Sequence, residues 1–327
     1  MLTERIETSK KVLKLASEMS QHYYHKPLII RYSGGKDSDV ILRLSMECLS
    51  SDEFEVLHSV TTVDSPVTNK YINTIFEELK DKGIKCEKSL PLGKDGKPTN
   101  MWKLIAEKQI PPTRLQRYCC AVLKEVSTPN RVAVLGVRSA ESTKRQGRDV
   151  FGVRGGSYKQ AMFFSLDHTA EVHHEALERE GEPNGTVWDC TLIKVMRENK
   201  DTVVNPIYAW SDHDVWDFLR GGCHPYNPMY DMGYHRVGCI GCPMATYKQK
   251  MKEFSDFPSY KDHYIKAFDE MLEARKKDGK DDVTGKDAFH CWKTGEDVFL
   301  WWIEEWKRNV KGQMTIDDYL KGGSTTK

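Results

Sequence analysis

The chain has 327 residues and a formal net charge of +1, with 39% hydrophobic and 30% charged residues. This balance is typical of a soluble globular protein and excludes a mainly disordered chain. A net charge near zero offers no global attraction to nucleic acid. No apolar run approaches about 18 residues, which excludes a transmembrane helix.

The N-terminal residues predict a helix and then a strand. Between residues 4 and 19 apolar side chains recur at helical spacing, and the pattern ends before Pro27. Charges occur throughout this stretch, so it lacks the apolar core of a secretory signal peptide. Residues 28–32 are expected to form a buried strand, and a helix is expected from about residue 39 to residue 49.

A glycine motif joins this strand to this helix: Ser33-Gly34-Gly35-Lys36-Asp37-Ser38. Two successive glycines let backbone N–H groups converge, because glycine reaches positive φ at little cost. Such a turn at a helix N-terminus suits a phosphate or pyrophosphate group. Lys36 adds a mobile positive charge and the serines add hydroxyl groups, whereas Asp37 suggests a Mg²⁺ ion or a helix cap. The spacing excludes a Walker-type loop.

Strands and helices alternate after the motif. Strands are expected at residues 55–62, 84–90 and 131–136, and helices at about 67–83, 101–108 and 119–126. This alternation predicts an α/β fold with a doubly wound, mainly parallel sheet. Ligands bind such sheets outside the carboxyl ends of the strands, which places residues 33–38, 61–65 and 137–145 on one rim.

The second half of the chain divides into an insertion, a further strand–helix unit and a helical end. Residues 151–199 show no clear periodicity and are expected to form an irregular, solvated insertion. A strand at 203–208 and a helix at 211–219 follow, and helices are expected at 260–277 and 296–309. We therefore expect an N-terminal helix at 1–26, an α/β domain at 27–245 and a helical C-terminal region at 246–327.

The nine cysteines favour a reducing, cytoplasmic compartment over a disulfide scaffold. Two pairs have ligand-like spacing, Cys119-Cys120 and Cys239-Ile240-Gly241-Cys242, and a C-x-x-C turn can direct two thiolates to one metal. Four thiolates suit a [4Fe–4S] cluster or a zinc ion, and free thiols are the third alternative. The cysteines that lack such spacing are expected to act as small buried hydrophobic residues: Cys48, Cys86, Cys190 and Cys223.

Basic side chains follow the strand at residues 131–136. Arg138 and Arg145 lie in the segment that begins at Gly136, together with Glu141. Guanidinium groups at the carboxyl end of a strand suit bidentate binding of phosphate or sulfate. A solvated basic loop is the alternative. Because the glycine motif is expected on the same rim, oxyanion binding is the favoured interpretation.

Taken in order, these motifs resemble the phosphoadenosine phosphosulfate (PAPS) reductase family. The motifs are residues 33–38, 117–119, 136–145, 205–206, 210–216, 227–230 and 238–243. The first of them is similar to the PP-loop of the adenine-nucleotide α-hydrolase superfamily, which acts at the α-phosphate of ATP-like nucleotides. Within the family, the likeness is to the branch that contains the DNA-phosphorothioation sulfurtransferase DndC, and it covers about residues 27–245.

The resemblance implies a set of site residues. Residues 33–38 would hold phosphate groups, with Lys36 and Asp37 as the catalytic pair. The nucleotide would also contact Thr61, Thr62, Asp64, Gly136, Arg138, Glu141 and Arg145. The metal ligands would be Cys119, Cys120, Cys239 and Cys242. The cofactors would be ATP, or PAPS or adenylyl sulfate, with Mg²⁺ and a [4Fe–4S] cluster, zinc being the alternative metal.

One feature departs from the family pattern. PAPS reductases carry a nucleophilic cysteine in a C-terminal segment, whereas no cysteine follows residue 307 here, and Cys291 lacks the family's Cys-Gly-x-His surroundings. We therefore expect an ATP pyrophosphatase or adenylylating enzyme of sulfur transfer, whose partner beyond the adenine nucleotide is a nucleic acid or a sulfurtransferase protein. The alternatives are a reductase-like enzyme that uses an external thiol or Cys291, and a non-catalytic nucleotide-binding subunit. The sequence specifies neither the acceptor nor the oligomeric state.

Overall fold

The computed structural model describes residues 2–125, 128–142, 145, 150–154, 161–165, 171–173, 192–196, 201–280 and 292–303. The chain divides into two compact units. Unit 1 comprises Met1–Pro98 and Cys120–Cys239, and unit 2 comprises Thr99–Cys119 and Ile240–Lys327. The N-terminal helix therefore belongs to unit 1, and a short segment from the middle of the chain joins the C-terminal helices in unit 2.

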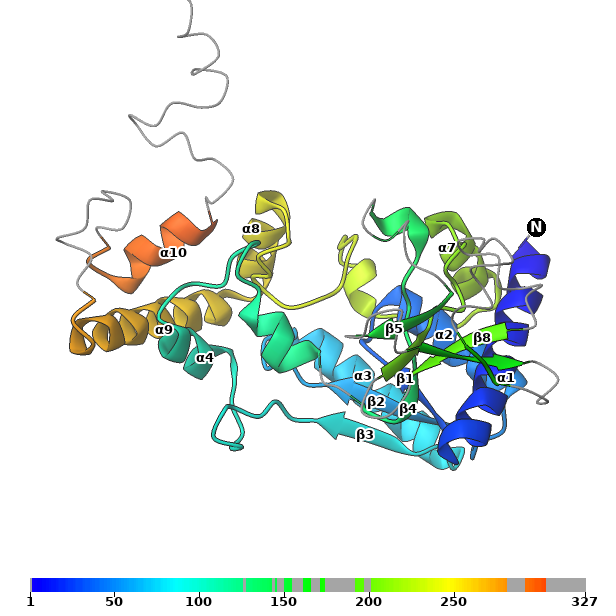
Figure 1. Ribbon diagram of the computed structural model, residues 1–327. Coiled ribbons are helices and arrows are strands. Elements are labelled where there is room, and N and C mark those ends of the chain that lie inside the picture. Colours follow the sequence, from blue (N-terminus) through cyan, green and yellow to red (C-terminus); the bar gives the residue numbers. More distant parts are fainter. Residues whose placement is uncertain are drawn as a thin grey trace, which may run out of the picture. The chain divides into compact units, whose positions relative to one another are not determined.

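Unit 1 is built on a six-stranded sheet with the order β3-β2-β1-β4-β9-β5 (Figure 1). Its strands are β1 (Leu28–Arg31), β2 (Phe54–Ser59), β3 (Cys86–Ser89), β4 (Arg131–Val134), β5 (Phe151–Arg154) and β9 (Asp201–Val204). Neighbouring strands are parallel except β5 and β9, which are antiparallel. The expected mainly parallel α/β fold is confirmed. The strand order reverses between β1 and β4, and sheets of this kind bind ligands at such a point.

In the described part of unit 1, four α-helices accompany this sheet: α1 (Leu2–Tyr24), α2 (Lys36–Cys48), α3 (Pro66–Asp81) and α7 (Asp212–Gly221). Helix α2 packs against both α1 and α7. Its side chains Val40 and Leu44 are fully buried in the same core as Leu28 and Ile30 of β1. The core thus fixes both ends of the connection between β1 and α2, and this connection is the glycine motif.

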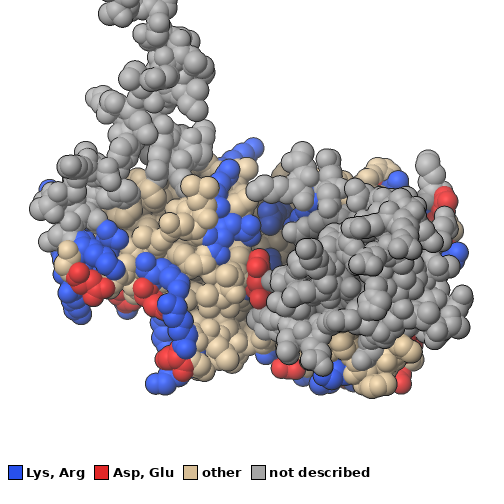
Figure 2. Space-filling model, viewed as in Figure 1, with Lys and Arg blue, Asp and Glu red and all other residues tan. Residues whose placement is uncertain are grey.

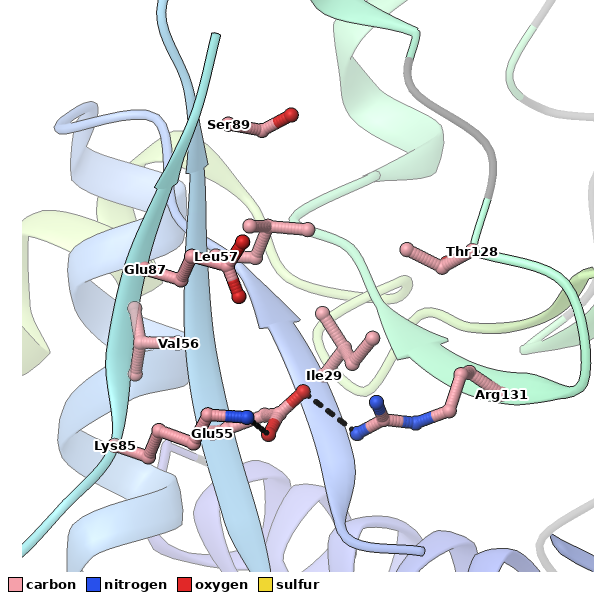
Figure 3. Close-up of a pocket in the computed structure, with 9 residues that line it drawn as sticks. All are labelled: Ile29, Glu55, Val56, Leu57, Lys85, Glu87, Ser89, Thr128 and Arg131. Atoms are coloured by element: carbon pink, nitrogen blue, oxygen red, sulfur yellow. Dashed lines mark hydrogen bonds and ion pairs between the residues drawn. The ribbon is translucent and has the colours of Figure 1, made fainter.

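One face of the sheet carries a pocket of about 220 Å³ (Figure 3). The Glu55 carboxylate forms two ion pairs at this pocket. Its Oε2 lies 3.0 Å from the Lys85 Nζ, and its Oε1 lies 2.8 Å from the Arg131 Nη2. The pocket is lined by Ile29, Glu55, Val56, Leu57, Lys85, Glu87, Ser89, Thr128 and Arg131. None of these lining residues belongs to the glycine motif, so the pocket is separate from the expected phosphate site.

The expectation of an irregular insertion at residues 151–199 is wrong for four described segments. Strand β5 extends the main sheet, and β6 (Ala161–Ser165), β7 (Glu171–His173) and β8 (Leu192–Met196) form an antiparallel sheet with the order β7-β6-β8. In β6 the apolar residues form a short continuous run rather than alternating with polar ones. Such a run gives no period-two signal, so the strand was not predicted. The remainder of this range lies outside the described residues.

Unit 2 contains the helices α4 (Met101–Lys108), α8 (Tyr247–Asp256), α9 (Pro258–Lys277) and α10 (Gly295–Ile303). Helix α9 packs against the other three. The rings of Tyr264 and Trp302, both fully buried, lie 4.6 Å apart at the centre of the unit. The expected helical C-terminal region is confirmed. Helix α8 was not predicted, because most of its residues are polar, and residues 304–309 of the expected last helix lie outside the described residues.

Within the described ranges, no helix has the length and apolarity needed to cross a membrane. Figure 2 shows lysine and arginine side chains directly beside acidic ones at the lower left of the face drawn.

Gly241 is required by the packing of unit 2. Its φ is +70°, and a Cβ there would lie 2.8 Å from Trp302 and 2.9 Å from Tyr264. We expect Gly241→Ala to lower the free energy of unfolding by about 2–4 kcal/mol, since backbone strain and overpacking add. Gly279 is the control: its φ is +65°, but nothing lies within 4 Å of a Cβ there. Thermal unfolding should show a clearly smaller loss for Gly279→Ala, and equal losses would contradict the packing argument.

Candidate functional site

The glycine motif forms a tight turn that is closed by the hydroxyl group of Ser38. This hydroxyl donates to the Gly35 carbonyl oxygen at 2.7 Å and accepts from the backbone N–H groups of Ser33 at 3.3 Å and Gly35 at 3.2 Å. Helix α2 begins at Lys36 rather than near residue 39, because the extended Gly35 is its N-cap and Ser38 closes the first turn. The predicted residues 33–38 therefore lie on the helix N-terminus itself, where unpaired donors favour an anion.

A second segment, Asn227 with the 3-10 turn Pro228–Tyr230, holds the glycine motif from outside. The Asn227 amide donates to the Gly34 carbonyl oxygen at 2.9 Å, and the Tyr230 hydroxyl accepts from the Lys36 N–H at 2.9 Å. Burial raises the pKa of Tyr230, which keeps this hydroxyl neutral. No role was assigned to Asn227 or Tyr230 from the sequence, although the dipeptide Asn227-Pro228 is a recognisable turn signal.

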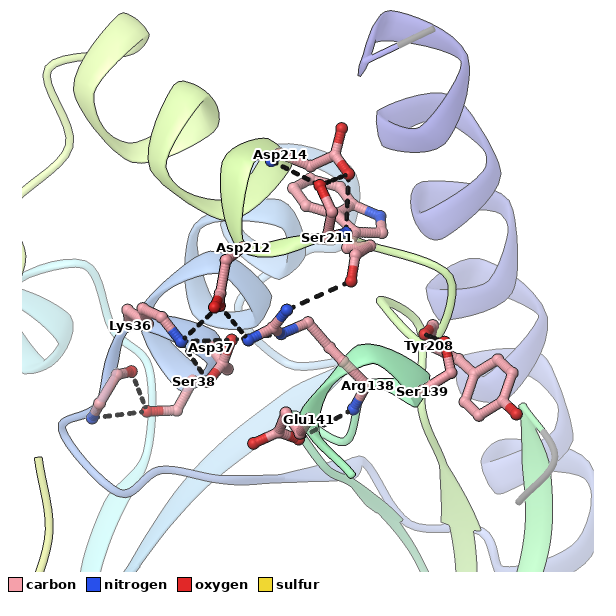
Figure 4. Close-up of polar contacts among 12 residues, drawn as sticks. Lys36, Asp37, Ser38, Arg138, Ser139, Glu141, Tyr208, Ser211, Asp212 and Asp214 are labelled. Atoms are coloured by element: carbon pink, nitrogen blue, oxygen red, sulfur yellow. Dashed lines mark hydrogen bonds and ion pairs between the residues drawn. The ribbon is translucent and has the colours of Figure 1, made fainter. Parts of the chain in front are cut away.

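Lys36 and Asp37 meet Arg138 and Asp212 beyond the carboxyl ends of β1 and β4 (Figure 4). The Arg138 Nε donates to Asp37 Oδ1 at 2.6 Å, and its Nη2 donates to Asp212 Oδ1 at 2.6 Å. The third guanidinium nitrogen, Nη1, donates to the Trp210 carbonyl oxygen at 3.2 Å. The Lys36 Nζ lies 3.3 Å from Asp37 Oδ2 and 3.1 Å from Asp212 Oδ1. We call these four charged residues the ion-pair network.

The members of the ion-pair network differ in how far their side chains are exposed to solvent. The side chain of Arg138 is 2% exposed and that of Asp37 20%, whereas that of Asp212 is 73% exposed. Burial disfavours the charged form of Asp212, but Lys36 and Arg138 outweigh it and lower the pKa of this carboxyl group. Gly136 abuts Asp37, since a Cβ there would lie 3.0 Å from the Asp37 Cβ. Arg138 is thus a buried structural centre of the network rather than part of a solvated basic loop.

The other predicted residues after β4 connect to the backbone of Arg138. The Glu141 carboxylate accepts the Arg138 N–H at 3.1 Å and forms an ion pair with Arg145. Glu141 is the last residue of a 3-10 turn, Ser139–Glu141, and its carboxylate closes that turn. The structure therefore brings Arg138, Glu141 and Arg145 into one connected group, next to the glycine motif through Asp37.

The predicted residues after β2 form a turn of their own. Asp64 accepts the Thr61 N–H at 3.3 Å, and Thr61 and Asp64 are both buried. Thr62 has a φ of +64°, which is rare for a β-branched residue and costs about 1–3 kcal/mol. Such strain is concentrated at functional sites, although it does not by itself assign a ligand. Asp64 also pairs through its backbone with Cys239 in an isolated antiparallel bridge.

The four predicted metal ligands are divided equally between the units. Cys120 and Cys239 belong to unit 1, and Cys119 and Cys242 belong to unit 2. Neither unit alone therefore contains three of these four cysteines, and no group of three or more His, Cys, Asp or Glu side chains suited to a metal ion occurs in the described part of the chain. Burial raises the pKa of Cys48 to about 11, and that of Cys86 likewise to about 11. Cys190 and Cys291 lie outside the described residues.

The loop between Cys239 and Cys242 is fixed by side chains of unit 2. The Glu253 carboxylate accepts the Gly241 N–H at 2.8 Å, and the Tyr264 hydroxyl donates to the Ile240 carbonyl oxygen at 2.9 Å. Both side chains are buried, Glu253 at 2% and Tyr264 at 1% exposure. These contacts fix the C-x-x-C loop, whose thiolates are donors that a [4Fe–4S] cluster or a zinc ion accepts, but the described residues do not gather the four cysteines into one metal-binding group.

A family model described as the phosphoadenosine phosphosulfate reductase domain matches residues 27–245. The chain belongs to this family. An uncharacterized protein of Methanocaldococcus jannaschii is 24% identical over 242 residues, which is 71% of this chain and 39% of the relative. The adenosine 5'-phosphosulfate reductase of Allochromatium vinosum is 45% identical over 42 residues, 13% of this chain and 16% of the reductase. The matches thus span less than half the length of these two relatives.

Among solved structures, the phosphoadenylyl-sulfate (PAPS) reductase of Candida auris, a phosphate complex, has a TM-score of 0.42 and 13% sequence identity. The comparison covers 72% of this chain and 89% of the reductase. The DndC-like branch within the PAPS reductase family stays a prediction.

A buried carboxyl group lies directly behind the glycine motif of this PAPS reductase domain. Asp39 is 1% exposed, and the Tyr32 hydroxyl donates to its Oδ1 at 2.6 Å. Burial raises the pKa of Asp39 to about 7, although the hydrogen bond from Tyr32 opposes this shift. Sequence reasoning treated this position only as the start of a helix, because nothing in the pattern distinguishes a capping acid from a buried one.

Asp39 makes the stability of the protein depend on pH. The pKa of Asp39 is about 7 in the folded protein, against an ordinary value of 3.8. Between these two values the folded protein keeps a proton on Asp39 that the unfolded chain releases. Stability from this group is therefore complete below about pH 4 and is lost as the pH rises through 7. We expect Asp39→Asn to gain stability relative to wild type between pH 4 and 8, at most about 1.4 kcal/mol per unit of pKa shift.

Urea unfolding of both proteins at pH 5 and pH 8 measures this effect. The control is Asp81→Asn at the exposed end of α3. A stability difference between Asp39→Asn and wild type that does not change with pH would refute the raised pKa.

Proposed function

We propose that this chain binds ATP or a related adenine nucleotide at residues 33–38 and acts at the α-phosphate, as an ATP pyrophosphatase or adenylylating enzyme of sulfur transfer. The observation that carries the proposal is the ion-pair network beside the glycine turn, at the reversal of strand order in a PAPS reductase domain. The proposal includes the DndC-like branch, and its acceptor is a nucleic acid or a partner sulfurtransferase protein.

The chemistry follows from the position of the charges. An oxygen atom of water or of the acceptor forms a bond to the α-phosphorus and gives up its proton to solvent, the bond from this phosphorus to the bridging oxygen breaks, and pyrophosphate leaves with the electron pair. Lys36 and the N-terminal end of α2 stabilise the negative charge on pyrophosphate. Asp37, held by Arg138, orients the Lys36 ammonium group.

A role of Asp37 as a Mg²⁺ ligand does not fit this arrangement. One carboxylate oxygen of Asp37 accepts from Arg138 and the other faces Lys36. Two positive groups at these oxygens disfavour a cation there. We therefore assign no step to a protein-bound Mg²⁺ ion, and any Mg²⁺ would enter with the nucleotide phosphates.

The cysteine pairs suit a [4Fe–4S] cluster that Cys119, Cys120, Cys239 and Cys242 would hold. When bound, such a cluster would supply an iron site that handles sulfur for transfer. The chain's own contribution is the fixed loop, because Glu253 and Tyr264 hold the backbone between Cys239 and Cys242. Zinc is the alternative for the same donor set.

A second candidate is a reductase-like enzyme that uses an external thiol as the reductant. The local identity of 45% to the Allochromatium vinosum adenosine 5'-phosphosulfate reductase favours it. Release of labelled sulfite from PAPS or adenylyl sulfate, in the presence of a thiol, would select this function over the first.

Product analysis by ³¹P NMR tests the main proposal. Incubation with ATP and Mg²⁺ should release AMP, or an adenylylated acceptor, together with pyrophosphate. Release of ADP and orthophosphate would contradict cleavage at the α-phosphate.

Lys36 and Asp37 should both be needed for turnover, and Lys36 should not be needed for folding. We expect Lys36→Ala to weaken triphosphate binding and to lower kcat by about 10²–10³-fold, as for the loss of one donor to a developing charge. Asp37→Asn should mainly lower kcat, because Lys36 loses its orienting carboxylate. Steady-state kinetics with circular dichroism as the folding control measures both effects. Lys97→Ala serves as the control, because Lys97 is an exposed lysine outside the motif. Unchanged kinetics in both Lys36→Ala and Asp37→Asn would remove the glycine motif from the mechanism.

The metal content of anaerobically purified protein tests the cysteine assignment. We expect about four iron and four sulfide per chain, with broad absorption near 400 nm. Cys239→Ser or Cys242→Ser should lose most of the iron and lower the stability, because metal-binding free energy adds to folding free energy. Cys48→Ser should keep the iron, since this half-buried thiol has a raised pKa. Stoichiometric zinc without iron would replace the cluster by a zinc site.

A further inference from the structure

A single oxygen atom of Asp212 is shared by both cations of the ion-pair network. Its Oδ1 lies 3.1 Å from the Lys36 Nζ and accepts from the Arg138 Nη2 at 2.6 Å. Sequence reasoning gave Asp212 no role. With Asp37 as the second carboxylate, the network contains two positive and two negative groups, so its charges cancel.

The two carboxylates of this network differ in their freedom to move. Asp37 is hemmed in by Gly136 and held by Arg138, and its side chain is 20% exposed. The side chain of Asp212 is 73% exposed at the first position of α7. The backbone beneath it is anchored separately, because Ser211 caps the helix through Asp214 and Asp214 pairs with Arg5.

We infer that Asp212 competes with nucleotide phosphate for Lys36 and thereby sets the affinity of the site for polyphosphate. This inference rests on the proposed function. A phosphate group that takes Lys36 must exchange with the Asp212 carboxylate, since two anions within about 4 Å of each other repel. Arg138 stays in place during this exchange, because Asp37 and the Trp210 carbonyl oxygen still hold it.

The exchange also favours release of the product. When pyrophosphate leaves, the Asp212 carboxylate pairs with Lys36 again. This return needs only a rotation of the Asp212 side chain and no backbone movement. Asp212 therefore weakens binding of substrate and of product alike. Its loss should tighten both, which distinguishes a competitor from a residue that merely positions Lys36.

Isothermal titration with inorganic pyrophosphate and Mg²⁺, at fixed ionic strength, tests this inference. Asp212→Asn keeps a hydrogen-bond acceptor but removes the charge, and we expect it to bind pyrophosphate roughly two- to fivefold more tightly than wild type, as for the loss of one exposed ion pair. In the ATP assay the same variant should show stronger inhibition by added pyrophosphate. Asp212→Glu should restore the wild-type affinity.

The matched control is Asp217→Asn on the same helix, whose carboxylate pairs with His213 rather than with the network. It should bind pyrophosphate as wild type does. Equal or weaker binding by Asp212→Asn, together with weakened binding by Lys36→Ala, overturns the competition and leaves the proposed function intact. Pyrophosphate binding that Lys36→Ala does not change, or no binding by any variant, overturns the proposed function and this inference with it.

Discussion

The ion pair between Arg138 and Asp37 is the interaction on which the proposed phosphate site depends. It joins the end of β4 to the glycine motif across 101 residues of sequence, at 2.6 Å and with the guanidinium group buried. Through its other nitrogens Arg138 also holds Asp212 at the start of α7 and the Trp210 carbonyl oxygen just before that helix. A buried cation of this kind must be paired on every side, because an unpaired charge in the interior is costly. Three segments are thereby fixed around Lys36.

The glycine motif and the mainly parallel sheet could be predicted because their signals are local. A buried strand, two glycines and an amphipathic helix stand next to each other, and the alternation of strands and helices fixes the sheet type. Asp212, Asn227 and Tyr230 could not be assigned in this way. Tyr230 meets Lys36 across 194 residues and Asn227 meets Gly34 across 193, and no spacing in the sequence encodes such distances.

The errors at the level of elements have local causes. Residues 161–165 form a strand without alternating polarity, α8 is a helix with few apolar positions, and α2 begins earlier than expected because Gly35 serves as its N-cap. Burial was equally invisible in the sequence. In the sequence Asp39 is one more acidic residue after the motif. In the structure it is 1% exposed, and this burial raises its pKa. The burial of Asp39 therefore depends on contacts that tertiary structure alone supplies.

A crystal structure of the protein with the α,β-methylene analogue of ATP tests the central claim most directly. We expect its phosphate groups within hydrogen-bonding distance of residues 33–38 and of the Lys36 Nζ, with the pair of Arg138 and Asp37 unchanged. A nucleotide bound in the pocket beside Glu55, with the glycine motif untouched, would contradict the assignment of the phosphate site.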